Sequence, residues 1–126
     1  AAAVAMPHDR LWAILDAQRQ ELVDAEFESG WKDRSAAVPN TRIVGVEQWL
    51  DELRAGDVVS GPPLDRIADR LPADVQVADP RQWSPRASIV GQIGVAAIHR
   101  GRAVDEVQLV PRYYRRSAAE EKAERQ

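Results

Sequence analysis

The chain has two histidines, His8 and His99, and no cysteine. Nucleophilic catalysis by serine needs a histidine and an orienting carboxylate that converge in space. His8 lies in a stretch without hydrophobic periodicity. His99 ends an apolar helical pattern, where the helix dipole favours a cationic side chain. The sequence also lacks a G-x-S-x-G motif. We therefore expect no catalytic triad.

Carboxylates offer two candidate metal or acid–base sites. The first would join His8 and Asp9 to Asp16, but without a characteristic ligand spacing. The second is a row of three acidic residues at alternate positions of a predicted strand, Asp24, Glu26 and Glu28. Like charges side by side on one strand face repel each other, so a solvent-exposed face explains this row better than a cation site. With no cysteine and no glycine-rich phosphate loop in the chain, we expect no metal site and no cofactor.

An arginine–tyrosine cluster near the C-terminus is a candidate nucleic-acid contact. Residues 111–116 have the sequence PRYYRR, and aromatic and guanidinium groups together can bind single-stranded RNA. From Pro111 to Gln126, five basic residues face three acidic ones, a balance of +2. An edge strand with its arginines in solvent is the alternative. A small RNA-contact module therefore remains one possible function.

Composition and charge exclude several broad classes. A length of 126 residues is typical of one domain, and 44% hydrophobic with 29% charged residues is typical of a soluble globular protein. Seventeen basic and twenty acidic residues give a net charge of −3, so no overall field attracts nucleic acid or an anionic membrane. The longest uncharged run, residues 87–98, is too short to cross a bilayer. We expect a cytoplasmic protein with no membrane partner.

The hydrophobic pattern predicts an α/β fold, with α+β as the alternative, built on a mixed sheet with about three helices. An apolar run at 11–16 and an alternating pattern at 23–28 predict an antiparallel hairpin that opens the sheet. Three further short strands and two amphipathic helices are expected: strands at 41–44, 57–60 and 75–77, and helices at 46–53 and 64–71. Residues 29–40 are expected to form a loop or a frayed strand.

A third helix is predicted from Ser84 as N-cap and Pro85 at the first helical position, with Gly101 just past its end. Residues 107–114 are expected to form a last strand, at an edge because of Pro111. The expected core consists of large apolar residues of these elements: Leu11, Ile14, Leu15, Phe27, Trp49, Leu50, Leu53, Ile67, Leu71, Ile89 and Ile93. In domain terms, we expect a linker or cloning remnant at 1–9, one domain at 10–116 and a tail at 117–126.

Two blocks of the sequence resemble the bacterial TsaB (YeaZ) proteins of the glycoprotease superfamily. LWAILDAQRQELVDAEF (11–27) is similar to the hairpin that opens their second lobe, an apolar strand followed by D-A-R-x-G-E-V-Y. Residues 85–100 and GRAVDEVQLVPRYYRRSAAEEK (101–122) are similar to their closing helix, G-[RK]-x-V-D turn and P-x-Y-L-R-x-x-x-A-E ending. The chain departs from the family pattern at three positions: Gln20 stands where the family usually has glycine, Val23 stands where it usually has tyrosine, and Tyr114 replaces the common leucine.

The resemblance covers about residues 10–122 and implies the C-terminal lobe of an actin-like/Hsp70-like ATPase fold. The family's first lobe has no counterpart in this sequence, so we expect the chain to be a fragment. The implied function is non-catalytic: a scaffold that supports the transferase TsaD, with the ATPase TsaE, in threonylcarbamoyladenosine modification of tRNA. The alternative that follows from the family's older name is a glycoprotease-like metallohydrolase.

The resemblance also implies which residues contact a partner or the cleft between lobes. Arg19 lies in the D-A-x-x-x-E segment, while Tyr113, Arg115 and Arg116 belong to the P-x-Y-x-R ending. Structural salt bridges are the alternative role for the arginines. The implied partners are homologues of TsaD and TsaE, with tRNA contacted indirectly, and the isolated chain should bind TsaD weakly or not at all. A lobe without its neighbour exposes apolar surface, so self-association is also expected.

Overall fold

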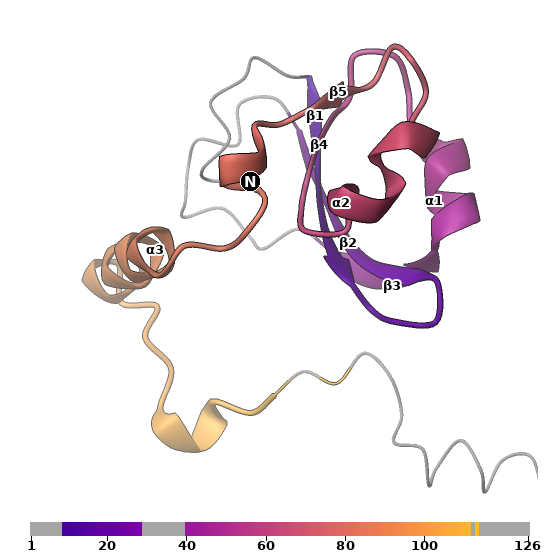
Figure 1. The fold of residues 1–126 in the computed structure, drawn as a ribbon. Coiled ribbons are helices and arrows are strands. Elements are labelled where there is room, and N and C mark those ends of the chain that lie inside the picture. Colours follow the sequence, from indigo (N-terminus) through magenta and orange to yellow (C-terminus); the bar gives the residue numbers. More distant parts are fainter. Residues whose placement is uncertain (1–8, 29–39, 112, 114–126) are drawn as a thin grey trace, which may run out of the picture.

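A five-stranded mixed sheet forms the centre of the protein (Figure 1). The computed structural model describes residues 9–28, 40–111 and 113. The strands are β1 (Arg10–Asp16), β2 (Glu21–Glu28), β3 (Thr41–Gly45), β4 (Val58–Ser60) and β5 (Gln76–Val77), in the order β3-β2-β1-β4-β5. The predicted α/β class, the mixed sheet and the opening hairpin are therefore confirmed.

The sheet changes direction at its central strand. β1 pairs antiparallel with β2, and β2 pairs antiparallel with β3. On its other side β1 pairs parallel with β4, which pairs parallel with β5. Side chains of this central strand are buried on both faces of the sheet, Trp12 and Ile14 in one apolar cluster and Leu11 in another, and strands buried on both faces are typically continuous apolar runs. This explains why LWAIL, which shows no alternation, forms β1 with Leu11, Trp12 and Ile14 all buried.

Two short helices cover one face of the sheet (Figure 1). α1 (Val46–Glu52) follows β3 directly, and α2 (Leu64–Ile67) continues into a 3-10 turn at Ala68–Arg70. Their apolar sides and the facing strand residues form the main core: Trp12, Ile14, Leu22, Val44, Val46, Trp49, Val59, Leu64, Ile67 and Val75. The rings of Trp12 and Trp49 meet edge to face, with 6.4 Å between their centroids. The helices predicted at 46–53 and 64–71 are thus confirmed, the second as an α-turn and a 3-10 turn.

The predicted core is only partly correct. Leu11, Ile14, Trp49 and Ile67 are buried as expected. The prediction for Leu15 is wrong, because this residue lies one position before the end of β1, on the sheet face away from α1 and α2, and is 47% exposed. The other expected core residues are half-buried: Phe27, Leu50, Leu53, Leu71, Ile89 and Ile93. Most of the core residues that the prediction missed lie on strands, such as Leu22, Val44 and Val59.

The third helix, α3 (Ala87–His99), lies on the opposite side of the sheet from α1 and α2 (Figure 1). Gly101 has φ +68° just past its end, as predicted. The predicted start is wrong: Arg86 is the N-cap, and no side chain caps the helix. Trp83 Nε1 donates to the Ala78 carbonyl at 2.8 Å, which holds this part of the chain beside β5. Residues 84–86 then lead from that anchor to the helix, so α3 begins two residues after Pro85.

The predicted last strand at 107–114 is wrong for the residues that the structure describes there, 107–111 and 113. A 3-10 turn at Glu106–Gln108 occupies its start, with the Asp105 carboxylate accepting from the Val107 N–H at 3.3 Å. Val107, Leu109 and Val110 are exposed, and the segment runs away from the sheet (Figure 1). Alternating apolar residues form a strand only where a sheet edge can pair with them, and this segment reaches none. The loop and tail predictions for 29–39 and 117–126 lie outside the described residues.

Candidate functional site

The four predicted contact residues fall in two separate places. Arg19 lies in the turn between β1 and β2, whereas Tyr113 lies beyond the 3-10 turn at Glu106–Gln108 and is 83% exposed. Figure 1 shows these two segments apart. Arg115 and Arg116 lie outside the described residues. Arg19 and Tyr113 therefore lie on separate segments, and the role of these residues as contacts stays a prediction.

The turn that carries Arg19 has an uncommon backbone. Gln18, Arg19 and Gln20 have φ values of +62°, +52° and +61°, a left-handed conformation that non-glycine residues adopt at a cost. The Asp16 carboxylate accepts from the Gln18 N–H at 2.8 Å and from Arg66 Nη2 at 2.8 Å. These two hydrogen bonds, that of Gln18 first, lower the pKa of Asp16. Asp16 therefore stabilises the turn, which explains its acidic side chain without a metal. His8 of the suggested metal site lies outside the described residues.

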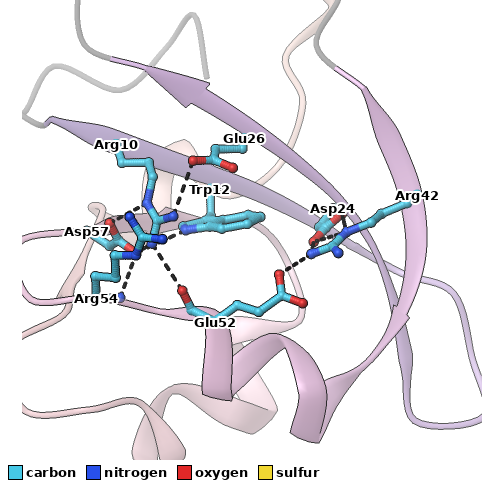
Figure 2. Close-up of polar contacts among 8 residues, drawn as sticks. All are labelled: Arg10, Trp12, Asp24, Glu26, Arg42, Glu52, Arg54 and Asp57. Atoms are coloured by element: carbon cyan, nitrogen blue, oxygen red, sulfur yellow. Dashed lines mark hydrogen bonds and ion pairs between the residues drawn. The ribbon is translucent and has the colours of Figure 1, made fainter.

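A buried carboxylate, Asp57, organises the densest polar cluster of the described residues (Figure 2). Asp57 is 3% exposed and accepts four hydrogen bonds. Two come from Arg10, at 2.8 Å from Nε and 2.6 Å from Nη2. The others come from Trp12 Nε1 at 3.1 Å and the Arg54 N–H at 2.9 Å. Burial raises the pKa of Asp57, but the hydrogen bonds from Arg10, Arg54 and Trp12 outweigh it, so the pKa is lowered.

Arg10 links this carboxylate to the strand and helix beside it. Its Nη1 lies 3.3 Å from a Glu26 oxygen, and its Nη2 also donates to the Glu52 carbonyl at 3.1 Å. The Arg10 guanidinium carbon lies 5.1 Å from the centre of the Trp12 ring, within the range of a cation–π interaction. The cluster thereby connects the start of β1, the loop before β4 and the end of α1.

A second buried carboxylate, Asp24, corrects the prediction for the acidic row. The row was expected to face solvent, yet Asp24 is 1% exposed. It lies opposite Arg42 on β3, whose Nε and Nη2 reach the two Asp24 oxygens at 3.1 and 3.0 Å. Arg42 also binds the Glu52 carboxylate of α1. Because α1 covers this face and Arg42 neutralises the charge, only Glu26 and Glu28 remain exposed as predicted.

The hydrogen bonds and ion pairs of these two clusters stabilise the fold. The hydrogen bond from Arg42 is the main cause that lowers the pKa of Glu52, and the hydrogen bonds from Arg10, Arg54 and Trp12 lower the pKa of Asp57 against the effect of its burial. Asp57 and Asp24 each bind an arginine, so their environments are alike. General acid–base catalysis needs two groups whose environments differ strongly. No group of three histidine or acidic side chains suited to a metal occurs among the residues that the structure describes.

The local sequence pattern does not predict these clusters, because Arg10, Asp57 and Arg42 are each an isolated charge at the edge of a predicted strand. The only available signal was the position of Arg10 and Asp57 at the starts of two strands that turn out to be parallel neighbours. To predict that Arg10 pairs with Asp57, one must know that β1 and β4 are neighbours, and the hydrophobic pattern of each strand does not give the strand order.

A cavity of about 250 Å³ lies between the sheet and α3. Its lining is mostly apolar and comes from β1 and β2 on one side and from α3 and the segment before it on the other. The sheet contributes Ala13, Leu15, Val23 and Ala25, and α3 contributes Ile89, Val90 and Ile93. This explains why the expected core stripe of α3 is only half-buried: it faces a space rather than closely packed side chains.

Comparison with known proteins leaves the family assignment open. No protein-family model matches the chain, and no curated protein matches its sequence. In the part of the chain that the structure describes, no helix has both the length and the apolar composition needed to span a bilayer.

Proposed function

We propose that this chain is the C-terminal lobe of a TsaB-like, non-catalytic scaffold that supports the transferase TsaD in threonylcarbamoyladenosine modification of tRNA. The observation that carries the proposal is the sheet. The block at residues 11–27, which resembles the hairpin opening the family's second lobe, forms β1 and β2. β3 completes an antiparallel meander, and β4 and β5 extend it as parallel strands. A lobe of an actin-like fold is built on a sheet of this kind, with helical connections between its parallel strands.

The hairpin turn adds support at a position where the sequence departs from the family pattern. Gln20 stands where the family usually has glycine, and its φ of +61° is the conformation that glycine adopts without strain. The turn thus has the backbone geometry that a glycine there would favour.

The chemistry of the buried acids supports a scaffold rather than an enzyme. Through Arg10, Asp57 links β1 to the end of α1, and through Arg42, Asp24 links β2 and β3 to the same helix. Arrangements of this kind fix the positions of secondary-structure elements, which a scaffold needs in order to present one surface to its partner.

A reconstitution assay tests the proposal. Purified TsaD, TsaE, tRNA and activated threonylcarbamoyl are incubated without TsaB, and the modified adenosine is measured by mass spectrometry. We expect the longer protein that the proposal requires to restore modification and the present chain alone to restore little. Failure of both proteins, each shown to be folded, would refute the proposal.

Variants of the longer protein test the predicted contact residue in the turn. If Arg19 contacts the partner or the cleft, Arg19→Glu lowers the yield of modified tRNA. Arg81→Glu, on an exposed 3-10 turn outside both resembling blocks, is the matched charge-reversal control and should leave the yield unchanged. Equal yields from the two variants would show that Arg19 is not a contact residue.

A further inference from the structure

The floor of the cavity beneath α3 is a row of four small residues that crosses four strands. In the strand register, Thr41 lies beside Ala25, Ala25 beside Ala13 and Ala13 beside Ser60. All four line the cavity. Because neighbouring strands place paired side chains on the same face, these small side chains form one transverse groove.

Larger residues border the groove on both sides. Leu15 and Val23, paired across β1 and β2, line one side. On the other side Leu11 packs with Phe27 and Val58 in a separate apolar cluster. α3 lies above, and Ile89 and Ile93 line the cavity from there. The groove is hollow because its central pair is alanine with alanine, flanked by leucine, valine and phenylalanine.

The groove is reachable from solvent. Leu15 is 47% exposed, and Val90 on the α3 side is 60% exposed. Apolar surface of this kind on both sides of a hollow is typical of a site for an apolar ligand, in which a few polar groups set the orientation.

The polar group that could orient a ligand is Arg86. It lines the cavity, it is exposed, and its side chain has no hydrogen bond or ion pair with the residues that the structure describes. Asp24 also borders the cavity, but it alternates with Ala25 along β2 and its carboxylate binds Arg42 on the other face. The charge available to a ligand in the groove is therefore positive.

We propose that this groove binds a straight-chain carboxylate, with the alkyl chain along the row from Thr41 to Ser60 and the carboxylate at Arg86. Three interstrand spacings of about 4.8 Å make the row about 14 Å long. A chain of roughly eight to ten carbons, which advances about 1.25 Å per bond in its extended zigzag and so spans about 9–11 Å, lies within that length. An anion with an apolar tail matches both the lining and the charge. A purely apolar molecule would match the lining but not the positive charge at Arg86.

Isothermal titration of the full chain with octanoate tests the proposal, with 1-octanol and octyltrimethylammonium as matched probes. We expect saturable one-to-one binding of octanoate, weaker binding of octanol, and no binding of the cationic probe. Arg86→Gln should weaken octanoate binding about fivefold, as expected for an exposed ion pair, and leave octanol unchanged. Arg102→Gln, an exposed arginine that does not line the cavity, should change neither.

A second variant tests the place of binding. Ala25→Leu fills the centre of the row and should weaken both octanoate and octanol at least about tenfold. Ala55→Leu adds the same volume at an exposed position outside the cavity and should have no effect. Circular dichroism checks that Ala25→Leu is folded, and Ala25→Val replaces it if it is not.

Three results would overturn the proposal. The first is no saturable octanoate binding, and the second is octanoate affinity that filling the row does not change. The third is equal affinity for the anionic and cationic probes. If octanoate fails to bind and the chain sediments as a dimer that Ala25→Leu dissociates, the occupant of the groove is a second copy of the chain.

Discussion

Replacing Asp57 by asparagine tests whether the buried cluster holds this fold together. The Asp57 carboxylate accepts four hydrogen bonds, two from Arg10 and one each from Trp12 and the Arg54 N–H. Asparagine keeps the shape but has one acceptor oxygen, and its NH₂ group faces donors that previously had an acceptor. The substitution also leaves Arg10, a largely buried guanidinium, with only Glu26 and a carbonyl of α1 as partners.

The expected loss of stability is large for a single substitution. Breaking a buried ion pair by removing one charge costs about 3–5 kcal/mol, because the remaining charge stays buried. Because Arg10 keeps its contact with Glu26 and asparagine keeps the volume of aspartate, we expect Asp57→Asn to lower the free energy of unfolding by about 3 kcal/mol, the lower end of this range. For a domain of this size, that loss lowers the Tm by about 10 °C.

The effect should depend on pH with a definite sign. Because the folded-state pKa of Asp57 is lowered, its stabilisation is fully present above the unfolded-state pKa of about 3.9 and is lost as the pH falls through the folded value. The difference between the parent chain and Asp57→Asn should therefore be constant from about pH 7 to 5 and shrink at lower pH.

Urea unfolding followed by tryptophan fluorescence measures both effects, at pH 7, 5 and 3.5. Asp51→Asn provides the matched control, since Asp51 is an exposed carboxylate on the same helix that Arg10 contacts. We expect the control to change the free energy of unfolding by less than about 0.5 kcal/mol. A loss below 1 kcal/mol for Asp57→Asn, or a difference that persists undiminished at low pH, would refute the proposed role of the cluster.

Three further predictions, two of them with a matched comparison variant, test local features of the fold by the same unfolding measurement. Gln20→Gly should stabilise by about 0.5–1 kcal/mol, because it removes a left-handed strain of about 1–2 kcal/mol at the entropic cost of a glycine. Gln76→Gly, where φ is not positive, should destabilise instead. Trp12→Phe should cost about 1.5–3 kcal/mol more than Trp49→Phe, because only the Trp12 indole donates to a carboxylate, whereas the buried Trp49 Nε1 has no partner in the described structure. Gly61→Ala should cost about 3 kcal/mol or more, since its Cβ would lie 2.0 Å from the Ile14 carbonyl oxygen; a loss under 1 kcal/mol would contradict this close approach.

The elements that could be predicted from sequence are those whose pattern depends on their own residues. The opening hairpin follows from the apolar run of β1 and the alternation of β2, and its register then brings Ala13 beside Ala25. α1 follows from apolar residues at helical spacing that place Val46 and Trp49 in the core. In both cases the side that becomes buried is visible in the local sequence.

The acidic row on β2 shows where this local argument stops. Alternation correctly indicates that Asp24, Glu26 and Glu28 share a face, but it does not indicate what covers that face. Coverage comes from α1 and from Arg42, which lie 18 or more residues along the chain from Asp24. The same holds for Asp57, whose partner Arg10 is 47 residues away in sequence. Whether these charged residues become buried, and with which partner, therefore depends on elements far away in the sequence.

The helix α3 presents the opposite problem, because its pattern predicts more burial than the described residues supply. From Ala87 to Ile98 it carries no charge, and a helix that is apolar on all sides is typically buried on all sides. Ile89 and Ile93 face the cavity, whereas Val95 and Ile98 are exposed and the space around Gly94 is open. The sheet thus accounts for one side of α3 only. The outer side of α3 has the apolar composition of an interface, which agrees with the predicted self-association. The inner side borders the groove, so the two features come from opposite sides of the same apolar helix.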